Sequence, residues 1–339
     1  MKPDFVVRNQ SAVYFDRAER LLPSLLEGRR VVLVTDGAIA QHYPALVAQW
    51  PKIVIGQGEG QKTLATVEQI HRALIELGAD RKSFLLAIGG GIVTDTAGFA
   101  ASTYMRGIDF GFVSTTLLGE VDASVGGKNG VNVGGYKNMA GTFNQPRFVV
   151  CDPAMLATLP VREFRAGLAE VVKSAVIGNK ALFERLESCT FEALRGDEAL
   201  ICEVVKGAVG VKAAIVERDE REAGDRKLLN LGHTLAHAIE KCSSVMNHGE
   251  AVAVGMRLVA DAAVAAGWLD PSDRTRICHL LERFGFTLEA PVSLEQLLAE
   301  VGKDKKSDGS RIDLVIPRRI GQCEVMPIEK EALNRLFCK

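Results

Sequence analysis

Three of the chain's six histidines fall within "NLGHTLAHAIEKCSSVMNHGEAVAVGM", residues 230–256. His233 and His237 are four residues apart, so they share one face of a helix, and His248 follows eleven residues later. Histidine nitrogens bind zinc, and catalytic zinc sites take three protein ligands and leave one position open. A lone H-x-x-x-H pair is a weak signal, and the H-E-x-x-H pattern of zinc proteases is absent. The stretch therefore suggests a metal site without deciding which histidines are ligands.

A carboxylate that could join these histidines lies upstream, in the helical pattern "REFRAGLAEVVKSAVIG" at residues 162–178. Glu170 and Lys173 are three residues apart and face the same way. Charged groups in an apolar pattern need partners. Glu170 with two of the three histidines would form a three-ligand set, and the alternative is an ion pair between Glu170 and Lys173.

Arg226 and Asn230 precede His233 on what the pattern predicts to be the same helix. A planar guanidinium there suits bidentate binding of a carboxylate. Alternatively, Arg226 pairs with the neighbouring acidic run "ERDEREAGD", which would be a surface ion pair of about 0–1 kcal/mol.

Glycines follow a predicted strand in "SFLLAIGGG" and precede a predicted helix. Glycine there lets main-chain N–H groups approach a pyrophosphate at the helix N-terminus. Thr94 stands where G-x-G-x-x-G requires its third glycine, so a plain tight turn fits as well. Asp36, at the end of the first long predicted strand, could bind a ribose hydroxyl or simply form a turn.

A glycine-rich stretch at residues 114–146 contains Asp122, Lys128, Lys137 and Asn138. Lysines in such loops suit phosphate or carboxylate recognition. A solvated surface loop is the alternative, although a loop of this length within a compact domain is more often functional.

The predicted elements divide the chain into two parts. Short apolar strands alternate with helices up to about residue 150, which predicts a mostly parallel, Rossmann-like sheet with helices on both faces. Helical patterns dominate after Pro160. We therefore expect an α/β domain at residues 1–158 and an all-α domain at 159–339, the first binding nucleotide and the second metal and substrate.

Composition narrows the class of protein. With 41 basic and 42 acidic residues the net charge is −1, so we expect neither a nucleic-acid partner nor a membrane surface. The seven cysteines are scattered and never form C-x-x-C, which is typical of reduced thiols in the cytoplasm. No apolar run reaches membrane-spanning length, and the N-terminus has no signal-peptide pattern.

A set of motifs in order along nearly the whole chain resembles the 3-dehydroquinate synthase family. The motifs are "GEGQK", "GGGIVTDTAGF", "STTLLGEVDASVGGKNGVN", "KNMAGTFNQP", "RAGLAEVVK", "DEREAGDRKLLNLGHTLAHAIE", "HGEAVAVGM" and "GKDKK". The resemblance implies a homodimeric enzyme that uses NAD and one divalent metal, zinc or else cobalt. It implies Glu170, His233 and His248 as the metal ligands.

The resemblance also implies roles for other residues. His237, Glu222, Lys173 and Asp122 would be catalytic. Substrate would be bound by Arg106, Lys128, Asn138, Lys212, Arg226, Asn230 and either Lys305 or Lys306. NAD would be bound by Asp36, Glu59, Lys62, Gly90, Gly91, Asp95, Thr115, Thr116, Lys137 and Thr158.

The reaction implied by the resemblance converts 3-deoxy-arabino-heptulosonate 7-phosphate to 3-dehydroquinate and phosphate, in the shikimate pathway to aromatic amino acids. A hydride passes to NAD and returns, phosphate is eliminated, and an intramolecular aldol step closes the ring. The alternatives are a related cyclase that makes 2-epi-5-epi-valiolone or 2-deoxy-scyllo-inosose, and a metal-dependent polyol dehydrogenase. The sequence departs from the family pattern at Thr94, Glu120, Asn129 and Asn144.

Overall fold

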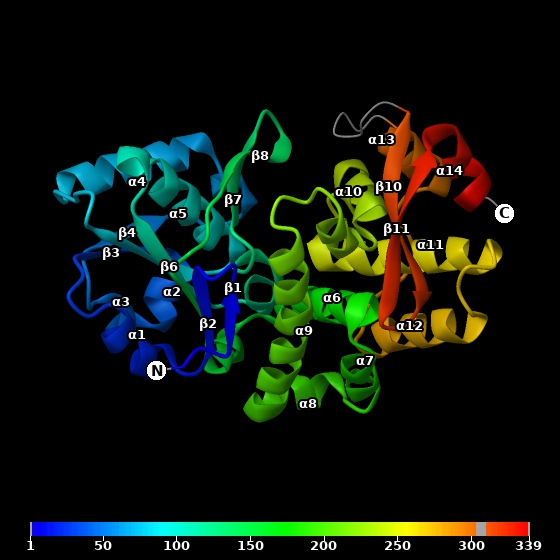
Figure 1. Ribbon diagram of the computed structural model, residues 1–339, viewed down its shortest axis with the longest axis horizontal. Helices are drawn as coiled ribbons and strands as arrows, with labels where there is room; N and C mark the ends of the chain where they lie inside the picture. The colour runs from blue at the N-terminus through cyan, green and yellow to red at the C-terminus, as the bar shows by residue number, and fades with distance from the viewer. Residues whose placement is uncertain (1, 303–309, 338–339) are drawn as a thin grey trace. The chain divides into compact units, whose positions relative to one another are not determined.

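The computed structural model describes residues 2–302 and 310–337. The chain divides into two compact units, Met1–Pro160 and Val161–Lys339, called here the N-terminal and C-terminal units (Figure 1). Lys305 and Lys306, one of which the family resemblance assigns to substrate, lie outside the described residues.

A seven-stranded sheet forms the centre of the N-terminal unit, in the order β1-β2-β9-β6-β5-β3-β4. Among the neighbouring strands of this sheet, only the β1–β2 pair is antiparallel. The predicted mostly parallel sheet is therefore confirmed. Its strands are β1 (Phe5–Val7), β2 (Ser11–Phe15), β3 (Val31–Asp36), β4 (Lys52–Ile55), β5 (Phe84–Gly89), β6 (Asp109–Ser114) and β9 (Phe148–Cys151).

Helices cover both faces of this sheet, because its central strands are apolar on both sides. Every residue of β5 and β9 is buried. Helices α4 (Leu64–Glu76) and α5 (Gly91–Thr103) lie on one face, and α1 (Ala18–Leu25), α2 (Gly37–His42) and α3 (Pro44–Val47) lie on the other (Figure 1).

The chain reverses its direction of travel across the sheet between β3 and β5. It passes from β3 to the edge strand β4, then returns through α4 to β5 on the other side of β3. In open α/β sheets, ligands bind outside the carboxyl ends of the strands at such a switch point. Asp36 ends β3, and Gly90 and Gly91 follow β5, so all three lie at this position.

The glycine-rich stretch at residues 114–146 is more ordered than the predicted loop. It contains a single π-helical turn, η3 (Gly119–Ala123), and the antiparallel hairpin β7 (Lys128–Val133) and β8 (Tyr136–Phe143). Strand β7 packs on α5, which is buried over most of its length between the sheet and this hairpin. Three short 3₁₀ turns complete the unit: η1 (Glu59–Gln61), η2 (Tyr104–Arg106) and η4 (Pro153–Thr158).

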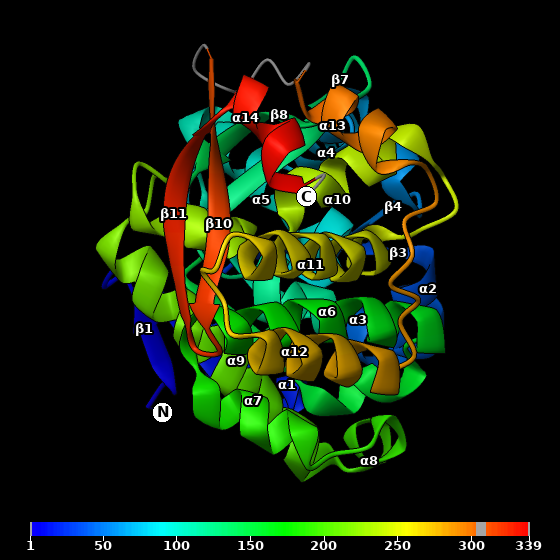
Figure 2. The same ribbon diagram turned by 90° about the vertical axis from the view of Figure 1, so that its right-hand side faces the viewer.

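The C-terminal unit is helical, as predicted. Helices α6, α11 and α12 run side by side at its centre (Figure 2). The helices are α6 (Val161–Gly178), α7 (Lys180–Glu187), α8 (Phe191–Gly196), α9 (Glu198–Arg218), α10 (His233–Cys242), α11 (His248–Ala265), α12 (Pro271–Arg283), α13 (Leu294–Gly302) and α14 (Lys330–Phe337). No helix among the described residues is long and apolar enough to cross a membrane.

The structure corrects the all-α expectation for this unit in one respect. Strands β10 (Arg311–Arg319) and β11 (Gln322–Glu329) form an antiparallel hairpin (Figure 2). Polar and apolar residues alternate along much of both segments, "RIDLVIPRR" and "QCEVMPIE". That alternation is the period of a half-buried strand, which the surrounding helical patterns obscured.

The structure also corrects the expectation that Arg226 and Asn230 share a helix with His233. They lie on a separate 3₁₀ turn, η5 (Asp225–Asn230), and α10 begins only at His233. Gly232 separates the two elements with a left-handed φ of 77°. Glycine adopts this conformation without the penalty that a Cβ imposes.

Candidate functional site

The two histidines that begin α10 and α11 converge on a carboxylate from the middle of α6. Nε2 of His233 lies 3.6 Å from Oε1 of Glu170, and Nε2 of His248 lies 3.4 Å from the same oxygen. One ligand atom from each of the three residues falls within 4.8 Å of the other two. Two imidazoles and a carboxylate at this separation form a donor set suited to zinc or a similar divalent ion.

The other nitrogen of each imidazole meets a separate acceptor. Nδ1 of His233 lies 3.2 Å from the carbonyl oxygen of Leu231, and Nδ1 of His248 lies 3.2 Å from Oε1 of Glu240. With Nδ1 donating a proton to these oxygens, the lone pair of each ring is on Nε2. Metal-binding histidines are usually oriented in this way, so the arrangement fits a metal centre.

Burial and charge affect the two histidines differently. Burial lowers the pKa of His233 to about 3, and the nearby charge of Lys173 acts in the same direction. Burial would also lower the pKa of His248, but its hydrogen bonds to Glu170 and Glu240 and their negative charges raise it to about 9. Nε2 of each ring must be free of a proton to bind a metal, so a metal would displace a proton from His248.

Glu170 also forms an ion pair with Lys173, one turn along α6. Both side chains are almost fully buried, with exposed fractions of 1% and 2%. The sequence offered an ion pair or a three-ligand set as alternatives, but the same carboxylate pairs with Lys173 and lies close to His233 and His248. Burying the Glu170 carboxylate would be costly without a partner, and the positive charge of Lys173 beside it offsets that cost.

Close approach of main chains brings Glu170, His233 and His248 together. A Cβ on Gly249 would overlap the main chain of Ala166 on α6, and a Cβ on Gly255 would overlap the carbonyl group of Gly232. Glycine at these two positions of α11 lets that helix approach α6 and the start of α10. His248 and His233 then reach Glu170.

Four other predicted residues of the C-terminal unit lie in different settings. His237 is exposed, and its ring centroid is 5.6 Å from that of His233. Nδ2 of Asn230 donates to Oε1 of Glu222 at 2.6 Å. Lys212, on α9, is buried with 6% of its surface exposed.

Arg226 is 2% exposed. Its guanidinium donates to the carbonyl oxygen of Glu220, and its main-chain N–H donates to Oδ2 of Asp219 at 3.0 Å. The sequence offered an ion pair with the acidic run as the alternative to substrate binding. Both of these contacts are with residues of that run, one with a main-chain carbonyl oxygen and one with a side-chain carboxylate.

In the N-terminal unit, the predicted nucleotide-binding glycines lie where β5 meets α5. Gly90 is the N-cap of α5, and a Cβ on it would lie 2.8 Å from Cγ2 of Thr116. The first N–H groups of a helix lack intrahelical acceptors and favour an anion. Asp36 accepts a hydrogen bond from the N–H of Ile39 at 2.9 Å and so caps α2. Thr115 and Thr116 follow β6, which adjoins β5.

Lys62 is held by two predicted site residues. Its Nζ donates to Oδ2 of Asp95 at 2.5 Å and to Oδ1 of Asn138 at 2.7 Å. Glu59, three residues earlier, accepts from Nδ2 of Asn132 at 2.7 Å. Because Asn132 also accepts a hydrogen bond from the main-chain N–H of Asn138, four predicted residues are joined in one network. They come from η1 and its C-cap, α5 and β8.

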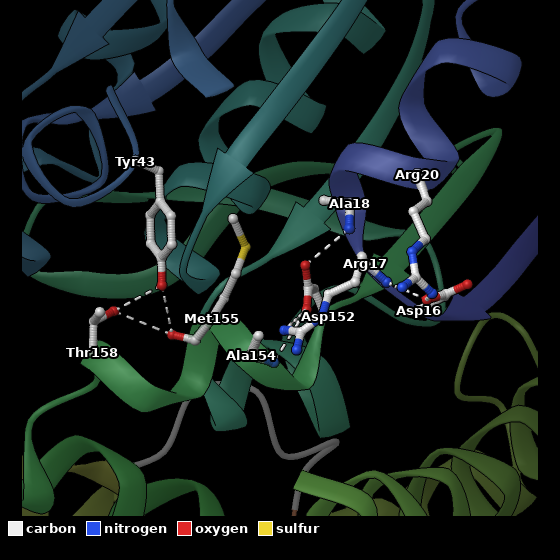
Figure 3. A network of polar contacts seen from close by, with 9 residues as sticks. All are labelled: Asp16, Arg17, Ala18, Arg20, Tyr43, Asp152, Ala154, Met155 and Thr158. Atoms are coloured by element: carbon white, nitrogen blue, oxygen red, sulfur yellow. Dashed lines mark hydrogen bonds and ion pairs between the residues drawn. The ribbon is translucent and has the colours of Figure 1, made fainter. Parts of the chain in front are cut away.

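Thr158 is linked to the segment that follows α2. Its hydroxyl lies 3.0 Å from the hydroxyl of Tyr43, and both hydroxyls donate to the carbonyl oxygen of Met155 (Figure 3). Of the remaining predicted residues, Lys128 and Lys137 lie on the hairpin β7–β8, Asp122 lies on η3, and Arg106 ends η2.

Three predicted site residues adopt left-handed backbone conformations, which are costly for residues other than glycine. They are Arg106, Asn138 and Glu222, with φ of 71°, 53° and 62°. Such conformations persist only where surrounding contacts enforce them, and they cluster at functional sites.

Two of the departures from the family pattern contact each other. Nδ2 of Asn129 donates to the carbonyl oxygens of Asn144 and Gly127, at 2.9 and 3.1 Å, and the Asn144 amide in turn donates to Ser102. Glu120 is fully buried in η3, and no hydrogen bond to either of its carboxyl oxygens is found among the described residues. Burial, with a smaller effect of Asp152, raises the pKa of Glu120 well above its usual value.

The sequence reasoning missed two polar residues of these networks, Glu240 and Asn132. Glu240 is seven residues after His233 on α10, so helical spacing could have placed it on the same face. Asn132 carries no such signal, because its partners come from a 3₁₀ turn and the facing strand.

Two solved structures that share this two-domain fold and are 25% identical to the chain are sugar-phosphate cyclases. A 2-epi-5-epi-valiolone synthase from Streptomyces hygroscopicus, with NAD and zinc bound, is 25% identical and superposes with a TM-score of 0.88 over 100% of this chain and 98% of its own. A 2-deoxy-scyllo-inosose synthase, complexed with carbaglucose-6-phosphate, NAD and cobalt, is also 25% identical, with a TM-score of 0.85 over 96% and 95% of the two chains.

Sequence identity is higher to a different synthase than to either of these two. The profile of the 3-dehydroquinate synthase N-terminal domain matches residues 52–166, and that of its C-terminal domain matches residues 167–307. A 3-dehydroquinate synthase from Xanthomonas campestris is 43% identical over 326 residues, covering 91% of this chain and 88% of its own. The chain belongs to the 3-dehydroquinate synthase family.

Proposed function

We propose that this chain is a phosphate-eliminating lyase that converts 3-deoxy-arabino-heptulosonate 7-phosphate to 3-dehydroquinate and phosphate, with NAD and one divalent metal. Membership of the family supports the reaction. The structural observation that carries the proposal is the convergence of Glu170, His233 and His248. These residues are the proposed metal ligands.

The described residues fit such a metal. Each histidine presents Nε2 to the carboxylate side and engages an acceptor through Nδ1. When bound, a divalent ion at this position supplies Lewis acidity that polarises a substrate hydroxyl or carbonyl oxygen. Lys173, beside Glu170, keeps a positive charge next to the ligand carboxylate and can hold a developing negative charge on substrate oxygen.

The C-terminal unit also supplies proton-transfer and anion-binding groups. His237, exposed and one turn after His233, is our proposed acid/base residue. The Glu222–Asn230 hydrogen bond would orient both side chains toward substrate hydroxyl groups. Lys212 and Arg226 are both buried basic residues. Lysine and arginine bind carboxylates and phosphates, and the proposed substrate carries one of each.

We assign the cofactor to the N-terminal unit. Its sheet has a switch point bounded by Asp36, Gly90 and Gly91, which supports dinucleotide binding there. When bound there, NAD would supply a transient acceptor for a substrate hydride. The proposed cofactor contacts also include Glu59, Lys62, Asp95, Thr115, Thr116, Lys137 and Thr158.

The same unit supplies proposed substrate-binding and catalytic residues. They are Arg106, Asp122, Lys128 and Asn138.

Comparison of three substrates tests the proposal against the related cyclases. The metal-loaded enzyme with NAD should release phosphate from the heptulosonate phosphate, and should do so far faster than from sedoheptulose 7-phosphate or glucose 6-phosphate. A preference for either of the latter two would instead assign the chain to a valiolone- or inosose-forming reaction.

We also propose that the enzyme is a homodimer in the cytoplasm, on the strength of the family resemblance alone. Sedimentation of the purified chain over a range of concentrations tests the dimer, and fractionation of the source cells tests the location.

A further inference from the structure

Asn132, on β7, forms hydrogen bonds with three residues of the N-terminal unit: Glu59 and Lys62, which are distant in sequence, and Asn138 on the facing strand β8. Its main-chain N–H donates to the carbonyl oxygen of Lys62 at 2.8 Å. Its side-chain Nδ2 donates to Oε1 of Glu59 at 2.7 Å, and its Oδ1 accepts from the main-chain N–H of Asn138 at 2.9 Å. One residue thus contacts a main-chain carbonyl, a carboxylate and a main-chain amide.

These bonds belong to a closed circuit. The main chain of Lys62 is tied to Asn132, while its Nζ donates to Oδ1 of Asn138 at 2.7 Å. Asn138 returns to Asn132 through its own N–H. Asn138 has a left-handed φ of 53°, a conformation that asparagine tolerates better than most residues but that still needs support. The circuit supplies that support, so the direction of the Asn138 side chain depends on Asn132.

The chemistry of the circuit suits an amide at position 132. The carboxylate of Glu59 only accepts hydrogen bonds, and the main-chain N–H of Asn138 only donates. Their common partner must therefore offer one donor and one acceptor on a single short side chain. Asparagine meets that requirement, and its two partners fix which side-chain atom is nitrogen and which is oxygen.

We propose that Asn132 is a positioning residue that orders the cofactor side and the substrate side of the N-terminal unit together. It holds the Glu59 carboxylate with its amide nitrogen and the Asn138 main chain with its amide oxygen. The inference rests on the proposed function, which assigns Glu59 and Lys62 to NAD and Asn138 to substrate.

Two substitutions separate the two halves of this role. Asn132→Ala removes both side-chain bonds, so NAD should bind about 10-fold more weakly and KM for the heptulosonate phosphate should rise about 10-fold. Asn132→Asp keeps an acceptor for Asn138 but loses the donor and places a negative charge against Glu59. It should weaken NAD binding at least as much while changing the substrate KM by less than about 3-fold.

Two quantities are measured on the metal-loaded full chain. Calorimetric titration gives the affinity for NAD, and steady-state kinetics at saturating NAD give the KM for the heptulosonate phosphate. Val133→Ala is the matched control, since Val133 is the next residue of β7 and is 41% exposed. Thermal unfolding shows which variants are folded. If Asn132→Ala does not fold, Asn132→Asp alone decides.

The inference is overturned if folded Asn132→Ala matches the Val133→Ala control in both quantities. It is equally overturned if Asn132→Asp affects NAD and substrate to the same extent, because general loss of structure would do that. Failure of the proposed function is distinguishable, since the unsubstituted enzyme would then release no phosphate from the heptulosonate phosphate.

Discussion

His248 lies between two carboxylates: its Nε2 is 3.4 Å from Glu170, and its Nδ1 is 3.2 Å from Glu240. Glu240 belongs to α10, the helix that begins with His233. The same helix therefore provides one proposed metal ligand and the group that orients another. A carboxylate behind a metal-binding histidine fixes the ring and makes its ligating nitrogen more basic.

We predict that Glu240→Ala weakens zinc binding by about 10- to 100-fold. Glu240→Gln should be intermediate, because its amide oxygen can still accept from Nδ1 but carries no charge. Competition with a chelator of known affinity measures both. Lys241→Ala, at the next and exposed position of α10, is the control. Unchanged zinc affinity in folded Glu240→Ala would remove Glu240 from the site.

Gly255→Ala tests how the proposed metal ligands are brought together. The added methyl group would overlap the carbonyl group of Gly232, directly before His233. We expect a loss of about 1–3 kcal/mol in the free energy of unfolding, as for other overpacked interiors, and weaker zinc binding. Denaturant titration and chelator competition check this. The control is Gly196→Ala, on α8, where the added Cβ meets no atom within 4 Å. Equal behaviour of the two variants would refute the packing argument.

Glu120 should make stability depend on pH. Burial, and secondarily Asp152, raises the pKa of Glu120 in the folded protein above its unfolded value of about 4.3. The contribution of protonated Glu120 to the free energy of unfolding is fully present below the unfolded pKa. It is lost as pH rises toward the folded pKa, by up to about 1.4 kcal/mol per pH unit, because the folded state keeps a proton that the unfolded state releases.

Glu120→Gln removes this titration, so its stability relative to the unsubstituted protein should increase as pH rises from about 5 to 8. Denaturant unfolding at several pH values in that range measures the difference. Glu27→Gln, an exposed position in the same unit, is the control and should show no such trend. A difference that is constant with pH would mean that Glu120 is ionised in the folded protein.

Arg226→Ala separates carboxylate binding from support of the acidic loop. If the guanidinium binds the substrate carboxylate, the drop in kcat/KM for the heptulosonate phosphate should correspond to about 2–4 kcal/mol of lost transition-state stabilisation. The drop in kcat/KM for sugar phosphates without a carboxylate should be smaller. If Arg226 only holds the main chain at Glu220, all substrates should lose equally. Steady-state kinetics on three substrates, with folding and zinc content verified, distinguishes these outcomes.

NAD should be needed only in catalytic amounts, because the hydride that leaves the substrate returns to it. We expect many product molecules per NAD and no lasting absorbance of NADH. Simultaneous assays of phosphate and NADH test this. Stoichiometric accumulation of NADH would instead identify a polyol dehydrogenase.

The sequence by itself determined the fold class and the kinds of chemical groups available. Alternation of apolar strands with helices predicted the parallel sheet, since both signals arise within one element. The residue types of Glu170 and the three histidines suggested a metal, and the run at Gly89–Gly91 suggested a nucleotide. The family resemblance then named His233 and His248, which residue spacing alone had left open.

Only the tertiary structure decided how these groups meet. His237 shares a helix face with His233, yet His248, from another helix, is the one that reaches Glu170. The break at Gly232 separated Arg226 from the helix of His233, and the Asn132 circuit joined a turn to two strands. Sequence spacing gives distance within an element, whereas distance between elements is set by packing, here by the close approaches at Gly249 and Gly255.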